Sequence, residues 1–316
     1  MQKRSAAKSS KGTARRAPVK LSRERLFRKI VIVGVGLIGG SLGMAARKKR
    51  LADTIVGVEP RADELKRAVA RKAIDRYETG FRSLEKAVHK ADLVILATPV
   101  GQLEAVARQL APCLSKGTVV TDVGSVKGYL VRHLEDQFSP NPSSRSSFVG
   151  GHPIAGREKS GIEAASANLF AGALCILTPT DRTAPEAFKK VQQFWEAIGV
   201  KTVAMEPDAH DRILAVVSHL PHLVAYALVN TALELQSKSG DLLSYSAGGF
   251  RDFTRVASSS PEMWRDICMA NRENLLAVIE AYEKILDRFK RLLVEGHAEG
   301  LRREFERAKT AKEKFN

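Results

Sequence analysis

From Lys29 onward, short runs rich in β-branched residues alternate with amphipathic segments long enough to form helices. Such an alternation predicts a mainly parallel sheet, because each helix carries the chain back to the start of the next strand. Helices are expected between most of the strands, for example at residues 102–110 and 184–198. We expect strands at residues 30–33, 54–58, 93–97, 118–121, 148–150, 174–177 and 201–205.

The pattern changes at Pro207, after which no strand-like run occurs. Paired glycines and a serine run at residues 245–260 predict a loop or a broken helix. The sequence SPNPSSRSS at residues 139–147 is typical of a surface loop. The C-terminal third is predicted to be all-helical, because helical periodicity covers residues 209–236, 262–293 and 298–312.

Charge changes the picture at the N-terminus. The chain has 316 residues and a net charge of +16, and half of this excess lies in residues 1–27. This segment has no apolar period, so we expect a disordered basic tail. Its simplest interpretation is a solvated tail; contact with nucleic acid or acidic lipids and a role as an organellar transit peptide stay open. A secretory signal peptide is not supported, because no apolar segment follows the charges.

The composition, with 44% hydrophobic and 27% charged residues, is that of a globular protein. The longest apolar stretch, residues 213–229, is interrupted by polar residues and a proline, so we expect no membrane partner. Cys113, Cys175 and Cys268 are far apart and odd in number, which fits neither a disulfide framework nor a zinc site. They indicate a reducing compartment, and we expect a cytoplasmic protein.

The strongest local motif is GVGLIGGSLG, which directly follows the first predicted strand. Gly34, Gly36 and Gly39 have the spacing of a dinucleotide-binding turn between a strand and a helix. The second glycine lets a pyrophosphate approach the backbone, so the phosphates are expected at the helix N-terminus beside Leu37 and Ile38. The alternative is a glycine turn without a ligand.

The next predicted strand ends at Glu59, where an acid accepts hydrogen bonds from the ribose hydroxyls and repels a 2′-phosphate. This favours NAD over NADP, although Arg61 is placed to receive such a phosphate. Thr98 and Pro99 end another strand and are expected to face the cofactor, unless they form an ordinary turn. The predicted fold class is α/β, a Rossmann-like, doubly wound and mainly parallel sheet followed by an all-helical C-terminal domain.

Several polar residues are suited to a substrate. His152 lies between glycines directly after a predicted strand, where a neutral imidazole can take a proton, or where it is simply structural. Ser125 follows another strand and either orients a substrate hydroxyl or caps the next helix. Arg251 and Arg255 lie four residues apart in the glycine-rich connection, where they hold a substrate carboxylate or lie at the surface.

His219 and His222 lie three residues apart on one face of a predicted helix, and Pro221 between them is expected to kink it. Each is either a pocket histidine or a histidine satisfied within the core. We expect no metal site, because only His210 is close enough in sequence to act as a third ligand.

In this order, GVGLIGGSLG, ATPV, DVGSVKG, GGHPIAGREKSG, SHLPH, GGFRDFTRVA and MWRDI resemble the prephenate dehydrogenases of bacterial tyrosine biosynthesis, over residues 29–295. The resemblance implies a dinucleotide-binding domain at residues 28–206, and a helical domain at residues 207–316 that binds substrate and forms a homodimer. It also implies oxidative decarboxylation of prephenate by NAD, which gives 4-hydroxyphenylpyruvate, carbon dioxide and NADH.

The resemblance extends to single positions. His152 matches the family's catalytic histidine, and Ser125 matches a serine that orients the substrate hydroxyl or that histidine. We also assign His219 to the substrate pocket. His222 matches the family's helical pocket histidine, and Arg255 matches its substrate-binding arginine. Glu158 and Arg251 match an acid and a basic residue that pair across the pocket mouth in some members.

Two alternatives remain. The substrate is arogenate, or both compounds, because Glu158 can accept the ammonium group that arogenate carries. A different class is an NAD-sensing or nucleic-acid-binding protein that uses the basic tail, which predicts salt-sensitive binding. Prephenate is the substrate that the resemblance favours, and we do not expect nucleic acid as a partner.

Overall fold

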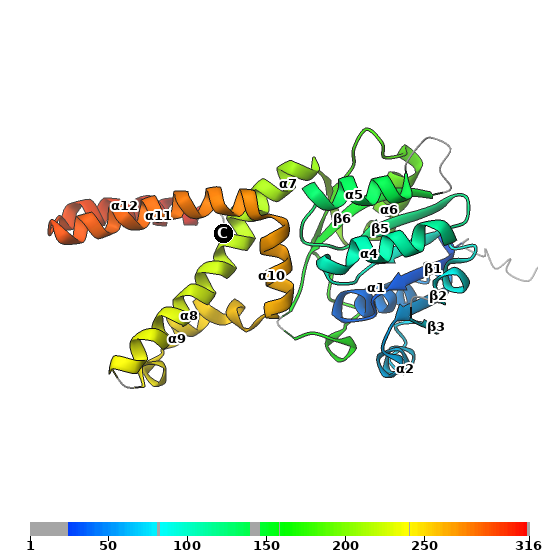
Figure 1. The fold of residues 1–316 in the computed structure, drawn as a ribbon, viewed down its shortest axis with the longest axis horizontal. Helices are drawn as coiled ribbons and strands as arrows, with labels where there is room; N and C mark the ends of the chain where they lie inside the picture. Colours follow the sequence, from blue (N-terminus) through cyan, green and yellow to red (C-terminus); the bar gives the residue numbers. More distant parts are fainter. Residues whose placement is uncertain (1–24, 81–82, 140–145, 158, 240, 315–316) are drawn as a thin grey trace, which may run out of the picture.

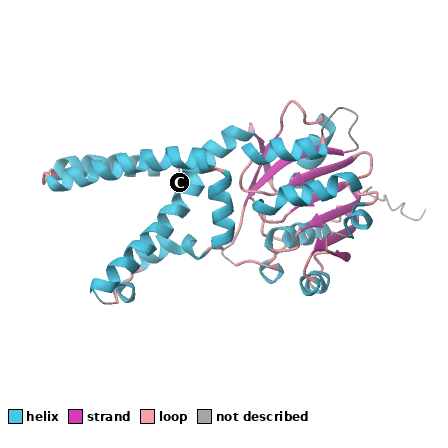
Figure 2. Ribbon diagram, viewed as in Figure 1, coloured by secondary structure: helices cyan, strands magenta, loops and turns pink. Residues whose placement is uncertain are grey.

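The computed structural model describes residues 25–80, 83–139, 146–157, 159–239 and 241–314. A sheet flanked by helices forms the first part, and only helices follow it (Figures 1 and 2). These helices extend from the sheet as two diverging arms, one with α8 (Leu220–Ser239) and α9 (Gly248–Thr254) and the other with α11 (Arg272–Val294) and α12 (Ala298–Glu313).

The sheet has eight strands in the order β3-β2-β1-β4-β5-β6-β7-β8. Neighbouring strands are parallel except for β6 and β7, which pair in antiparallel orientation. The first six strands have the doubly wound order, whose switch point lies between β1 and β4. The strands are β1 (Phe27–Val33), β2 (Ala52–Glu59), β3 (Arg76–Thr79), β4 (Leu93–Leu96), β5 (Thr118–Asp122), β6 (Ser146–Ile154), β7 (Leu174–Thr178) and β8 (Lys201–Ala204).

Both faces of the central strands are buried, which explains their continuous apolar sequence. Ile32 and Ile95 belong to the core on one face, whereas Val31 and Val94 belong to the core on the other. Complete burial of such side chains stabilises the fold by about 1.5–3 kcal/mol each. The first face is covered by α1 (Leu37–Lys48), α2 (Ala62–Ala70) and α6 (Pro185–Ala197), and the second by α3 (Leu84–Val88), α4 (Val100–Leu110) and α5 (Gly128–Phe138).

All seven predicted strands are confirmed, with bounds that differ by a few residues. The sequence pattern does not predict β3, whose residues, RYET, are polar and only partly buried because the strand lies at the edge of the sheet. Ser146 and Ser147, expected in a surface loop, instead begin β6. Strand β1 begins at Phe27, which is buried, so the fold starts slightly before the expected end of the tail. The rest of the tail, residues 1–24, lies outside the described residues.

The C-terminal part is helical, as predicted. A π-helical turn at Ala215–His219 interrupts the helix expected at residues 209–236. It ends two residues before Pro221, which has no N–H to donate to the carbonyl of Val217 within that turn, so the irregularity lies one turn before the expected kink. The helices are α7 (Pro207–Leu214), α8 (Leu220–Ser239), α9 (Gly248–Thr254), α10 (Pro261–Ala270), α11 (Arg272–Val294) and α12 (Ala298–Glu313).

The prediction of one continuous helix at residues 262–293 is wrong, because the helix ends at Ala270 and a new one begins at Arg272. Asn271 between them is buried and turns its amide toward α7 and the π-helical turn. The connection at residues 245–260 is a broken helix, as expected.

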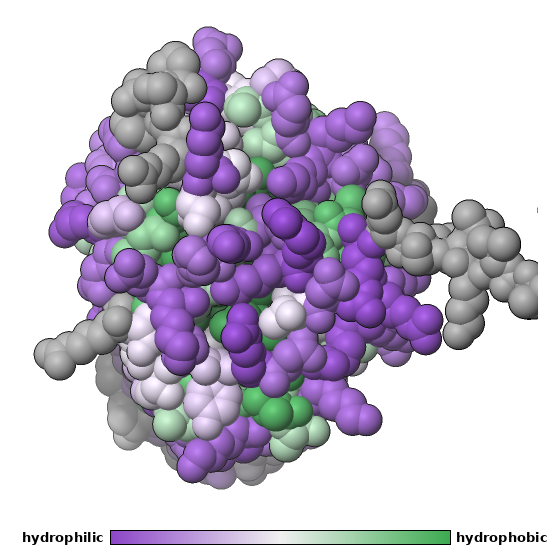
Figure 3. Space-filling view, turned by 90° about the vertical axis from the view of Figure 1, so that its right-hand side faces the viewer, coloured by the Kyte–Doolittle hydropathy of each residue, from purple (hydrophilic) through white to green (hydrophobic). Residues whose placement is uncertain are grey.

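The helical arms expose many apolar side chains. Among the described residues, one helical run, Pro207–Gln236, is long and apolar enough to cross a membrane by length and composition, and only 22% of its most apolar window is buried. In contrast, the end of the molecule that carries the sheet is mostly hydrophilic, with small, separated apolar patches (Figure 3). The unburied apolar surface therefore belongs mainly to the helices, for example at Val217, Leu233, Leu235 and Leu276.

Candidate functional site

The glycine turn lies at the switch point of the sheet, where it packs against the end of β4. Gly34 has a φ of +94°, and a Cβ there would lie 2.6 Å from the carbonyl oxygen of Ala97. Only glycine permits this approach, because the backbone conformation and the contact both exclude a side chain. The turn is thereby held beside Thr98 and Pro99, which precede α4.

Gly36 and Gly39 are constrained in different ways. A Cβ at Gly39 would lie 1.9 Å from the carbonyl oxygen of Gly34, so this glycine lets α1 pack onto the turn. A Cβ at Gly36 meets no atom within 4 Å, so the space in front of this residue is open. Within the described turn, α1 begins at Leu37 with neither a side-chain cap nor an acidic residue in its first turn. Its free N–H groups and positive dipole end therefore suit an anionic group at Leu37 and Ile38.

Two further groups lie at the same edge of the sheet. The hydroxyl oxygen of Thr98 is buried without a hydrogen-bond partner among the described residues. Glu59 ends β2, and its Oε1 lies 3.1 Å from Nε of Arg61. The predicted cofactor residues thus gather at the carboxyl ends of β1, β2 and β4, with Arg61 held on Glu59.

His152 lies in β6, and only 9% of its surface is exposed. Its Nδ1 is 2.8 Å from Nε2 of His210, and Nδ1 of His210 is 2.7 Å from Oδ1 of Asp211. Burial lowers the pKa of His152 well below its ordinary value, and the neighbouring His210 and Lys127 act in the same direction. His152 is therefore an uncharged imidazole at neutral pH.

A buried ion pair anchors the loop that contains Ser125. Nζ of Lys127 is 2.5 Å from Oδ2 of Asp122, and both side chains are fully buried. Asp122 also accepts hydrogen bonds from the backbone N–H groups of Gly124, at 2.7 Å, and Gly151, at 3.1 Å. Because Gly151 directly precedes His152, this carboxylate ties the end of β5 to the strand that carries the histidine.

His219, at the end of the π-helical turn, is buried beside Asn271. The Asn271 amide donates to the carbonyl oxygen of Asp211 at 2.8 Å, and the same nitrogen lies 3.1 Å from Nδ1 of His219. Nδ1 of His219 is therefore an acceptor, and the ring proton is on Nε2. This Nε2 is buried without a hydrogen-bond partner among the described residues, although the backbone of Ser125 is near enough to affect the ring's pKa.

The other predicted site residues are more dispersed. His222 donates from Nδ1 to the carbonyl oxygen of Ser218 at 2.9 Å, and its ring stacks on Trp264 with centroids 3.8 Å apart. Arg255 begins the short helical segment after α9 and is exposed, as is Arg251, whose Nε lies 3.4 Å from the Ser246 hydroxyl. The structure thus places His219 near enough to His152 to affect its pKa, with His222 and the Ser125 backbone beside His219, whereas the two arginines lie on a separate segment against α8. Glu158 lies outside the described residues.

Two family models match nearly the whole described chain. The model of the prephenate dehydrogenase nucleotide-binding domain matches residues 42–204, and that of the prephenate dehydrogenase dimerization domain matches residues 206–307. The chain belongs to the prephenate dehydrogenase family.

Individual relatives support this membership. The chain is similar to the prephenate dehydrogenase of Bacillus subtilis, with 37% identity over 89% of this chain and 74% of that protein. It is also similar to the cyclohexadienyl dehydrogenase of Zymomonas mobilis, with 35% identity over 91% of this chain and 96% of that protein. A prephenate dehydrogenase from A. aeolicus, solved with hydroxyphenyl propionate and NAD+, superposes with a TM-score of 0.85 and 40% identity over 92% of this chain and 98% of that one.

In this member of the prephenate dehydrogenase family, several residues of the site are not predicted from the sequence. Some lie outside the motifs quoted above, and others lie inside DVGSVKG or MWRDI without a predicted role. Adjacent histidine and aspartate residues at the start of a helix are one such pair. The residues are Asp122, Lys127, His210, Asp211, Trp264 and Asn271.

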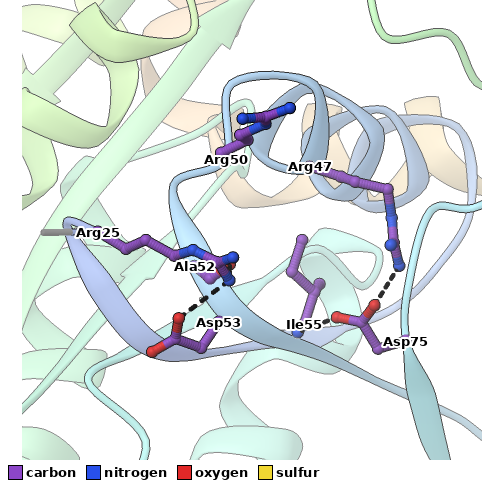
Figure 4. A pocket seen from close by; sticks show the side chains of 7 residues that line it. All are labelled: Arg25, Arg47, Arg50, Ala52, Asp53, Ile55 and Asp75. Atoms are coloured by element: carbon purple, nitrogen blue, oxygen red, sulfur yellow. Dashed lines mark hydrogen bonds and ion pairs between the residues drawn. The ribbon is translucent and has the colours of Figure 1, made fainter. Parts of the chain in front are cut away.

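A pocket at the opposite edge of the sheet is a poor candidate for the site of this family member. It has a volume of about 360 Å³ and lies beside Ala52, where β2 begins (Figure 4). Its Arg25 and Arg47 are already paired with Asp53 and Asp75. Ligands of doubly wound sheets bind at the carboxyl ends of the strands, so this pocket is on the wrong side.

Acidification is expected to destabilise the fold through His219. Burial lowers the pKa of this residue to about 4, so the folded protein keeps it neutral at pH values where the unfolded chain already binds a proton. Its stabilisation is complete above the unfolded value of about 6.5 and is lost as the pH falls toward 4, which amounts to about 3 kcal/mol. Urea unfolding at several pH values measures this slope. His219→Gln should reduce this slope to the part that His152 and His210 contribute, because their pKa values are also lowered, and an unchanged slope would contradict the assignment.

Proposed function

We propose that this chain catalyses the NAD-dependent oxidative decarboxylation of prephenate to 4-hydroxyphenylpyruvate and carbon dioxide. The observation that carries the proposal is His152, a buried and uncharged imidazole at the edge of the sheet where the glycine turn also lies. A base is needed there, because removal of hydride from a hydroxyl-bearing carbon gives that hydroxyl carbonyl character. The family membership supplies the substrate class.

The residues at the switch point fit NAD. The open space in front of Gly36 and the uncapped start of α1 suit the pyrophosphate, and the unpartnered Thr98 hydroxyl suits a polar group of the ligand. Glu59 suits the ribose hydroxyls. Its Oε1 contacts Arg61, and a carboxylate has a second oxygen that can accept a hydrogen bond from a ribose hydroxyl. When bound, NAD accepts the hydride.

His152 handles the proton. In the proposed reaction it accepts the proton of the ring hydroxyl as the C–H bond at that carbon breaks. The ring carboxylate then leaves as carbon dioxide, and the electron pair of the broken C–C bond remains in the ring, which becomes aromatic. The phenolate oxygen regains the proton from His152. No net proton is released, and aromatisation makes the step effectively irreversible. Ser125 is proposed to orient the hydroxyl or the imidazole.

The substrate carboxylates require donors. His219 offers a buried Nε2–H that has no hydrogen-bond partner within the described chain. His222, stacked on Trp264, is proposed to line the same pocket. We propose that Arg255 binds a carboxylate and that Arg251 pairs with Glu158 at the pocket mouth.

We expect Arg255→Gln to raise the KM for prephenate by about tenfold or more with little change in kcat, because it removes a carboxylate contact that is present in the ground and transition states alike. Initial rates over a range of prephenate concentrations test this. Arg303→Gln is a matched control, since Arg303 is also an exposed arginine of the helical part but lies on α12, outside the predicted site. A depressed kcat with a normal KM would contradict the binding role.

We propose that the division of the chain at Pro207 is functional as well as structural. Residues 28–206 would bind the cofactor, and residues 207–316 would bind substrate and form the homodimer. The exposed apolar side chains of the helices and the match to a dimerization domain support this arrangement. We propose that the apolar side chains of α8 pack against a second copy of the chain rather than against a membrane. A cytoplasmic location remains a prediction.

The assignment of substrate is tested by NADH or NADPH formation from prephenate and from arogenate, each with NAD and with NADP. We expect prephenate with NAD to be the fastest combination. Equal turnover of arogenate would indicate dual specificity, as the name of the Zymomonas mobilis relative allows. Absence of turnover in all four assays would refute the proposed function.

A further inference from the structure

We propose that His210 and Asp211 are positioning residues that fix the ring and the tautomer of His152, so that Nε2 is the nitrogen that accepts the substrate proton. Neither residue lies in one of the sequence segments quoted above for the resemblance. The inference deepens the proposed function, on which it rests for the identity of the substrate.

Two backbone hydrogen bonds hold the carboxylate of Asp211 in place. Its Oδ1 accepts a hydrogen bond from the backbone N–H of Lys127 at 2.7 Å, and its Oδ2 accepts one from Gly128 at 2.8 Å. Gly128 begins α5, so the carboxylate also lies at the positive end of a helix. Burial opposes ionisation of Asp211, but the hydrogen bonds from His210, Lys127 and Gly128 outweigh it and lower the pKa. Asp211 is therefore an anion that only accepts hydrogen bonds.

The tautomers of both histidines follow from this anion. Nδ1 of His210 faces the Asp211 carboxylate at 2.7 Å, so Nδ1 must carry a proton. Burial lowers the pKa of His210, so the ring is neutral and its Nε2 has a lone pair. Nδ1 of His152, 2.8 Å away, must then be the donor. A neutral His152 has one ring proton, which leaves the lone pair on Nε2.

The arrangement is protected from water and spans both parts of the chain. The side chain of His210 is fully buried and that of Asp211 is 5% exposed, so water does not compete for these hydrogen bonds. When His152 takes a proton, its Nδ1–H still donates to His210, whose own Nδ1–H donates to the Asp211 carboxylate. The nearby cation of Lys127 is paired with Asp122. His219 is the remaining titratable neighbour. The first helix after the sheet thus supports a base that lies on the sheet.

Two substitutions of His210 separate positioning from packing. His210→Leu removes the acceptor for His152 Nδ1, and we expect kcat to fall by about 10²-fold or more while the KM values for prephenate and NAD stay within about twofold. In His210→Gln the amide oxygen can accept from His152 Nδ1, so kcat should stay within about tenfold of wild type. Ser146→Ala is the matched control, because it removes a buried hydrogen bond at the other end of β6 and should keep full kcat.

The tautomer is measured directly by ¹⁵N NMR of the histidine side chains in the full-length protein, with the His152 signals identified by their loss in His152→Asn. We expect a protonated Nδ1 and an unprotonated Nε2. A protonated Nε2, wild-type kcat in His210→Leu, or equal losses in the Leu and Gln variants would each overturn the inference. If the wild-type protein formed no NADH from prephenate, the proposed function would fail, and the NMR measurement would still decide the tautomer.

Discussion

Replacing His152 with asparagine is expected to lower kcat for NADH formation from prephenate by a factor on the order of 10² to 10⁴, while the Kd for NAD changes by less than about twofold. The asparagine amide can still donate to Nε2 of His210, which now contacts the histidine ring at 2.8 Å, so the packing is largely kept. It has no basic nitrogen, however, and cannot accept the hydroxyl proton. Steady-state rates and calorimetric titration with NAD measure the two quantities.

His133→Asn is the matched control for this variant. His133 lies on α5, and its Nδ1 contacts the carbonyl oxygen of Tyr129 rather than any residue of the site. The control should retain the activity of the wild-type protein. If the His152 variant also turned over at the wild-type rate, the histidine would have no part in the chemistry.

Replacing Gly36 with valine is expected to weaken NAD binding by about 10²-fold or more, with a change in the free energy of unfolding of no more than about 1 kcal/mol. The φ of Gly36 is −77°, which any residue adopts, and a Cβ there meets no atom within 4 Å. The valine side chain would thus enter the open space proposed for the pyrophosphate without disturbing the fold. Titration with NAD and urea unfolding test the two parts separately.

Gly39→Ala provides the contrast, because a Cβ there would lie 1.9 Å from the carbonyl oxygen of Gly34. This variant should lose stability by several kcal/mol, since the turn and α1 must move apart. Undiminished NAD affinity in Gly36→Val would show that the pyrophosphate binds elsewhere.

The sequence predicts most of the fold, because buried parallel strands are continuous apolar runs that alternate with amphipathic helices. It does not predict β3, where an edge position removes the need for apolar residues on both faces. It also misses the helix break at Asn271, since this residue is compatible with a helix and leaves it only to bond with the Asp211 carbonyl and His219. Such breaks depend on contacts between distant segments.

In the candidate site, too, some residues can be predicted from local sequence and others depend on contacts between distant segments. Gly34, Gly36 and Gly39 are predictable because the turn itself requires them, and His152 stands out between glycines. In contrast, the sequence draws attention to His210 only as a possible third metal ligand beside His219 and His222, and no metal site is expected there. Its place beside His152 results from the packing of α7 against the end of the sheet, which no local pattern encodes. The arginines of the connection remain predictions.

In the proposed reaction, His152 accepts the hydroxyl proton of prephenate beside bound NAD. The most direct measurement is a crystal structure with NAD and 4-hydroxyphenylpyruvate. We predict that the phenolic oxygen lies about 2.6–3.2 Å from Nε2 of His152, with the ring against the nicotinamide. A product bound away from His152, or an Nε2 turned away from both ligands, would contradict the role of His152 as the base.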